Sequence, residues 1–155
     1  MQAQTAAAAA AASESPTWGA LEVGIATFAA LHIGLALLMA IDAHAFFTAV
    51  GPFGAYNAHY IHDVATFYFA LGAGLAVSLA RPSWRVPVLA VTLVQYALHS
   101  INHLIDIDKA HPAWTGYFDF FSLAAATLLL AWLLRAALAA RAGPPPITRP
   151  QGAVR

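Results

Sequence analysis

The chain has 155 residues, of which 61% are hydrophobic and 9% charged, and its seven acidic and seven basic residues leave no net charge. A typical soluble domain has about 25% charged residues, so this composition excludes a water-soluble protein and predicts a single integral membrane domain. The neutral balance gives no reason to expect a nucleic-acid partner, and the lack of cysteine excludes disulfides and thiolate metal sites.

The two ends of the chain differ from its middle. Residues 1–17 form an Ala-rich segment without a basic start, which predicts a disordered tail and not a signal peptide. Residues 142–155 are Pro-rich, and we expect a second disordered tail there. The region between them, residues 18–141, is therefore the expected membrane domain.

Four apolar stretches of this domain are long enough for the about 20 residues that a membrane-spanning helix needs. They cover residues 18–41, 58–80, 86–107 and 116–140, and they predict an all-α, four-transmembrane-helix bundle. The connection at residues 42–57 is too short to cross a membrane. Its aromatic residues predict an interfacial or re-entrant segment.

The basic residues predict how the bundle is oriented. Six of the seven lie in the second connection, near the end of the fourth span or beyond it: Arg81, Arg85, Arg135, Arg141, Arg149 and Arg155. Only Lys109 lies in the third connection, on the opposite side. Because cytoplasmic loops carry the excess of Lys and Arg, we expect a multi-pass protein of the cell membrane with both termini in the cytoplasm.

A polar stripe interrupts the third predicted span, in the run QYALHSINHLIDID at residues 95–108. At about 100° per residue of a helix, five of its polar side chains fall within an arc of about 100°. These residues are Gln95, His99, Asn102, His103 and Asp106. Polar side chains are costly in hydrocarbon, so we expect the stripe to face the interior of the bundle and to meet partners there.

The second span begins with a comparable run, YNAHYIHDVAT at residues 56–66. His59 and Asp63 are four residues apart, Tyr56 and Thr66 extend the same face, and His62 lies on its flank. Since the second and third spans run in opposite directions, their polar residues should lie at matching depths.

The first and fourth spans each add a polar residue at a similar depth. His32 interrupts the first span and Asp119 lies near the start of the fourth. All four spans can therefore direct a polar group to one place in the outer leaflet. By itself, His32 fits a hydrogen-bonded core residue better than a ligand.

Imidazole and carboxylate groups four residues apart are suitable ligands for Zn²⁺, Fe²⁺ or Mn²⁺. We therefore predict a transition-metal site with five ligands: His59, Asp63, His99, His103 and Asp119. Six further residues are expected to support these ligands or to contact a bound molecule: His32, Tyr56, His62, Gln95, Asn102 and Asp106. Two other interpretations stay open. The polar residues could carry protons or hold a small ligand without metal, or they could only fix the packing of the helices, for about 0.6–2 kcal/mol each.

The runs YNAHYIHDVATFYFAL and QYALHSINHL resemble a family of small bacterial membrane proteins of uncharacterised activity, with the pattern YNxHxxxDxxxxxxAL and then HxxxHL. The overall plan is similar to the DoxX-type four-helix membrane proteins. This resemblance implies four spans and a shared polar centre at Tyr56, Asn57, His59, Asp63, His99 and His103. Where the family has a basic residue before the aspartate, this chain has His62.

Four hypotheses for function follow from these residues. The first is a metal-dependent membrane protein, for example an enzyme that acts on a lipid or a quinone. The second is a metal-free module that binds or transports a proton or a small ligand. A haem protein with one histidine from each of two spans is the third, and its polar surroundings make it the less favoured cofactor. The fourth is an accessory subunit of a membrane complex, and a homo-oligomer is also compatible with the sequence.

Overall fold

The computed structural model describes residues 18–142, so both predicted tails fall almost entirely outside the described residues. Its four long helices are α2 (Ala20–Ile41), α4 (Ala58–Ala80), α5 (Arg85–Ile105) and α6 (Ala113–Ala142). Each of them is long and apolar enough to cross a membrane. The predicted bundle of four transmembrane helices is therefore confirmed.

The helix boundaries differ from the predicted spans by a few residues. Helix α4 begins as predicted, because the side chain of Asn57 accepts a hydrogen bond of 3.1 Å from the backbone N–H of Tyr60. Helix α5 ends at Ile105 instead of residue 107, and Asp106 is its C-cap. Helix α6 begins at Ala113 and extends to Ala142, beyond both predicted limits.

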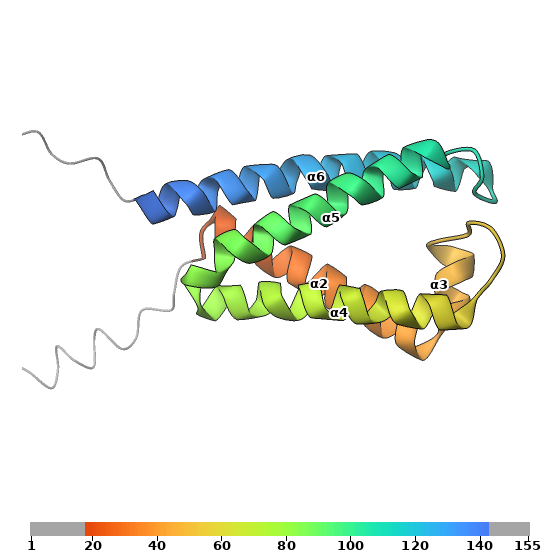
Figure 1. The fold of residues 1–155 in the computed structure, drawn as a ribbon, viewed down its shortest axis with the longest axis horizontal. Helices are drawn as coiled ribbons and strands as arrows, with labels where there is room; N and C mark the ends of the chain where they lie inside the picture. Colours follow the sequence, from red (N-terminus) through yellow and green to blue (C-terminus); the bar gives the residue numbers. More distant parts are fainter. Residues whose placement is uncertain (1–17, 143–155) are drawn as a thin grey trace, which may run out of the picture.

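The connection between α2 and α4 contains a short helix, α3 (Ala43–Ala49). Asp42 begins it by accepting a hydrogen bond of 2.9 Å from the N–H of Ala45. Helix α3 contacts α2 and α4 and lies across their ends (Figure 1). This position agrees with an interfacial segment, one of the two forms expected for this connection.

The four long helices form two pairs. Helix α2 packs chiefly on α4, and α5 packs chiefly on α6, whereas contacts between the pairs are sparser. The pairs lie close together where the short 3₁₀ helix η1 (Pro82–Trp84) joins α4 to α5, and they diverge toward α3 (Figure 1). We call these two ends of the bundle the η1 end and the α3 end.

Two apolar clusters hold the helices together. The larger one includes Ile25, Leu75, Leu89 and Leu130, one fully buried residue from each long helix, and it lies in the half of the bundle toward the η1 end. The smaller one, around Met39 and Ile61, draws on α2, α3 and α4 alone. Apolar packing therefore joins the two pairs at the η1 end, while the α3-end cluster belongs to one pair.

Gly72 allows α2 and α4 to approach closely. A Cβ atom at this position would lie 2.7 Å from Cγ1 of Ile33 and 3.0 Å from both Cβ of His32 and the backbone nitrogen of Ile33. A backbone atom cannot move aside as a flexible side chain can. The close contact between α2 and α4 therefore depends on a residue without a side chain at this position.

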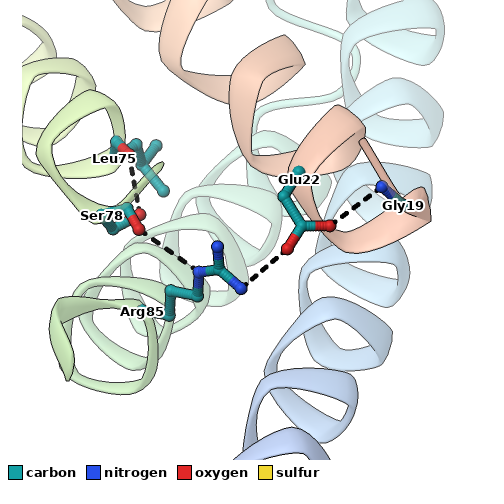
Figure 2. A network of polar contacts seen from close by, with 5 residues as sticks. All are labelled: Gly19, Glu22, Leu75, Ser78 and Arg85. Carbon is teal, nitrogen blue, oxygen red and sulfur yellow. Dashed lines mark hydrogen bonds and ion pairs between the residues drawn. The ribbon is translucent and has the colours of Figure 1, made fainter. Parts of the chain in front are cut away.

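An ion pair joins the two helix pairs at the η1 end (Figure 2). Nη1 of Arg85 lies 2.8 Å from Oε1 of Glu22, and the two side chains are 16% and 29% exposed. Nε of Arg85 also donates to the carbonyl of Ser78 at 3.3 Å, and Oε2 of Glu22 accepts from the N–H of Gly19 at 3.1 Å. One arginine on α5 is thereby bound to both α2 and α4.

The connections at the α3 end touch one another. Phe53 and Ala110 form an isolated antiparallel bridge, and the N–H of His111 donates to the carbonyl of Pro52 at 3.3 Å. The α3–α4 loop therefore reaches across to the α5–α6 loop and links the diverging ends of the two pairs.

Candidate functional site

The polar stripe of α5 turns partly toward the interior of the bundle. Gln95, His99 and His103 are half-buried, as we expected from their spacing. Asn102 is exposed, so the interior arc of α5 is narrower than predicted. Asp106 is half-buried at the end of the helix, where its Oδ1 lies 2.7 Å from Nζ of Lys109. This hydrogen bond raises the pKa of Lys109 above its ordinary value.

The polar face of α4 points away from this stripe. The side chains of His59 and Asp63 are 88% and 64% exposed, and they form a loose pair with 3.6 Å between Nε2 and Oδ2. Tyr56, His62 and Thr66 are also exposed. The apolar face of α4 takes the interior instead, because Ile61 packs with Met39 in the smaller core. The expected meeting of the two stripes does not occur in the structure.

The five predicted metal ligands do not form one site. Within residues 18–142, no three His, Cys, Asp or Glu side chains are arranged to hold a single metal ion. The two imidazoles of His99 and His103 do come together, with ring centroids 4.7 Å apart. They offer two ligands from adjacent turns of α5, without a third from α4.

His32 is fully buried at the middle of α2. Its Nδ1 lies 2.7 Å from the carbonyl oxygen of Phe28, and its ring centroid lies 5.3 Å from that of Tyr68 and 5.5 Å from that of Tyr96. His32 is therefore buried and hydrogen-bonded within its own helix through one of its two nitrogens. The position of this residue also brings α2, α4 and α5 together around one imidazole.

Polar side chains continue from His32 toward the α3 end. Tyr68 packs against the ring of His32, and Gln95 on α5 lies one helical turn before His99. His99 contacts His103, whose ring in turn meets Phe53 at a centroid distance of 4.8 Å. A run of polar groups thus follows the inner side of α5 from mid-membrane to the loops.

Four buried side-chain atoms on α2, α5 and α6 lack a hydrogen-bond partner among the described residues. They are Nε2 of His32, Oε1 of Gln95, Nδ1 of His103 and Oδ2 of Asp119. A buried polar atom without a partner costs about 1–3 kcal/mol, so four of them on α2, α5 and α6 require an explanation. We name the residues His32, Tyr68, Gln95, His99, His103 and Asp119 the interior polar cluster.

Two surface grooves lie elsewhere. One of about 570 Å³ runs between α4 and α5 toward the η1 end and is lined mainly by apolar residues such as Leu71, Val88 and Val91. The other, of about 290 Å³, lies between α2 and α4 and includes His62 and Thr66. Neither groove is lined by a residue of the interior polar cluster.

Comparison with known protein families, with curated proteins and with solved structures finds no match for this chain. The resemblance to a family of small bacterial membrane proteins, and to the DoxX-type plan, therefore stays an expectation.

Three residues that make polar or aromatic contacts inside the bundle were not predicted as such from the sequence: Tyr68, Glu22 and Arg85. Tyr68 could have been found from the buried face of α4, because Ile61, Ala65, Tyr68 and Gly72 follow helical spacing. Glu22 was visible as an acid inside the first apolar span. Its partner Arg85 could be read only as a loop charge, because the sequence does not show which helix ends meet.

Proposed function

We propose that this protein is a membrane-embedded binding protein that holds a small molecule with its interior polar cluster, between the two helix pairs. The observation that carries the proposal is the set of four unpartnered buried atoms on three helices. A bound molecule that hydrogen-bonds to them would remove their desolvation cost.

The apolar core favours binding over transport through the bundle. Below the cluster, toward the η1 end, Leu75, Leu89, Leu130 and Leu133 are fully buried and draw on α4, α5 and α6. Ionisable groups that move protons across a membrane must continue from one side to the other. Here the run of imidazole and phenol side chains ends at His32 and Tyr96, near the middle of the helices, which supports a site reached from the α3 end.

The charges support an orientation with the α3 end outside the cytoplasm. Arg81, Arg85 and Arg141 lie at the η1 end of the described helices, and Lys109 lies at the α3 end. In this orientation both termini are cytoplasmic, as we expected, and the protein resides in the cell membrane. The cluster then faces the outer leaflet, from which a membrane-soluble molecule could enter it.

Purification without a histidine tag, followed by organic extraction and mass spectrometry, tests the proposal. We expect a small molecule to accompany the wild-type protein and to be lost from Gln95→Leu and His103→Leu variants. His59→Ala is the matched control, because this histidine is exposed on α4 and should leave the bound molecule in place. Equal retention in all variants, or no bound molecule in any, would contradict the proposal.

A transition metal on His99 and His103 is a second candidate, supported by the 4.7 Å between their ring centroids. Zn, Fe or Mn bound there would need further ligands from the bound molecule or from water. Elemental mass spectrometry of the same preparations decides it: a stoichiometric metal that His99→Ala removes and His59→Ala retains would establish this site. A haem between α4 and α5 is not supported, because His59 and His62 are exposed.

A further inference from the structure

We infer that the molecule bound by the interior polar cluster is a largely apolar phenol or hydroquinone that donates hydrogen bonds from its hydroxyl groups. This inference rests on the proposed function and specifies the ligand of the same site. It follows from which atoms of the cluster lack partners and from what surrounds them.

The hydrogen bond of His32 fixes the role of its free nitrogen. The carbonyl oxygen of Phe28, 2.7 Å from Nδ1, can only accept, so Nδ1 must carry the hydrogen. In the neutral ring Nε2 then has a lone pair and no hydrogen. Nε2 is buried and unpartnered, so His32 presents an acceptor that only a donor can satisfy.

A second unpartnered atom is also an acceptor, because Oε1 of Gln95 is an amide oxygen. The roles of the other two atoms, Nδ1 of His103 and Oδ2 of Asp119, depend on where the proton of each group lies. The two atoms with a fixed role therefore both call for donors. A ketone, ether or quinone, which has only acceptor oxygens, would leave them unpaired.

The surroundings of His32 suit an aromatic body. Tyr68 and Tyr96 pack around its ring, and Phe28 meets Tyr96 edge-on at a centroid distance of 5.7 Å. Aromatic rings favour such offset and edge-on partners over flexible chains. A flat ring with hydroxyl groups combines this contact surface with the donors that the free atoms require.

Charge excludes two other ligand classes. Arg85 begins α5 and Lys109 follows its end, but Arg85 is bound to Glu22 and Lys109 to Asp106. Neither cation is therefore free to neutralise an anionic ligand in the interior polar cluster. An ammonium group would supply donors, but burying a full charge at mid-membrane costs far more than burying a hydroxyl group. A neutral hydroxyl donor is therefore the group that fits.

Matched probes test the inference in the full-length chain reconstituted in lipid nanodiscs. We would measure binding of 4-hexylphenol and of 4-hexylanisole by calorimetry, with empty nanodiscs subtracted. The two probes have the same ring and chain, but the anisole has no donor. We expect the phenol to bind at least about tenfold tighter, the equivalent of one good hydrogen bond.

Two variants show which acceptor the phenol uses. Its single hydroxyl group donates one hydrogen bond, so one of the two variants His32→Leu and Gln95→Leu should reduce the preference for the phenol to about twofold or less, while the exposed His62→Leu variant keeps it. A preference that survives in both interior variants would contradict the inference. Retained thermal unfolding transitions will show that the variants fold, and the comparison of the two probes on the wild-type protein does not depend on either variant.

Three outcomes distinguish the proposed binding function from the inference that the ligand is a phenol or hydroquinone. Equal binding of both probes would overturn the donor inference and keep the binding function. If neither probe binds but a molecule still co-purifies and is lost with Gln95→Leu, the phenol class is wrong and the binding function stands. If neither probe binds and nothing co-purifies, both proposals fail.

Discussion

His32 makes one hydrogen bond, and that bond lies within its own helix. Its Nδ1–H donates to its own helix, at the carbonyl of Phe28, so it needs no partner from another helix. Its Nε2, by contrast, is turned among aromatic rings of α4 and α5 without a partner. A residue that served only stability would have its second nitrogen paired as well, because an unpaired buried nitrogen is costly.

Substituting His32 by leucine tests this assignment at the residue scale. Leucine has a similar volume and removes both polar atoms, so we expect stability to change by less than about 1 kcal/mol, in either direction. Thermal unfolding in one detergent measures it. Leu75→Ala is the comparison, since this fully buried leucine should cost about 2–5 kcal/mol. A loss above about 2 kcal/mol for His32→Leu would mean that the histidine is structural.

Helix α4 has an apolar face that is packed and a polar face that is exposed. Its apolar residues Ile61 and Ala65 pack in the core with α2, and its polar residues His59 and Asp63 are left on the exposed side. Gly72 continues the packed face and sets the distance to α2. The packed face, and not the polar one, therefore determines the orientation of this helix.

At the element scale we expect Gly72→Ala to destabilise the bundle by about 1–3 kcal/mol, because the added Cβ meets the backbone of α2. Gly34→Ala is the matched control. A Cβ at Gly34 meets nothing within 4 Å, and alanine should gain about 0.5–1 kcal/mol in the helix. The free energy of unfolding, from titration with a denaturing detergent, distinguishes the two. Equal effects of the two substitutions would contradict the close approach.

The ion pair between α2 and α5 can be measured by a double-mutant cycle. For Glu22→Gln and Arg85→Gln we expect a coupling energy of about 1–3 kcal/mol, because the contact is short and both side chains are partly buried. For the exposed pair, His59→Ala and Asp63→Ala, we expect less than about 1 kcal/mol. Additive effects at Glu22 and Arg85 would show that this contact does not join the helix pairs.

The whole molecule is joined most strongly at one end. The shared apolar core and the Glu22–Arg85 pair both lie toward the η1 end, whereas the α3 end is linked through loop contacts such as Phe53 with Ala110. The interior polar cluster lies in the less tightly joined half. A ligand could therefore enter there without disturbing the apolar core.

The orientation of the whole molecule can be tested by labelling, because the natural chain has no cysteine. We expect Lys109→Cys to react with a membrane-impermeant maleimide in intact cells. Ser83→Cys, in the η1 turn, should react only after the membrane is opened. Both residues are exposed, so a difference in reactivity reports sidedness and not burial. The reverse pattern would place the α3 end in the cytoplasm.

The sequence by itself determined the four spans, the membrane class and the polar face of α5. Each depends on local information, such as a run of apolar residues or a spacing of four along one helix. His32 as a core group and Gly72 as a contact residue could also be predicted in this way. In each case the property belongs to the residue and its own helix.

Only the tertiary structure decided which polar faces meet. His59 and Asp63 are four residues apart on α4, just as His99 and His103 are on α5. The face of α4 that carries the first pair is exposed, whereas the face of α5 that carries the second pair is half-buried in the bundle. The choice depends on how α4 packs against α2 through Ile61, Ala65 and Gly72. A sequence gives the faces of each helix, but the rotation of a helix about its axis is set by the helix packed against it.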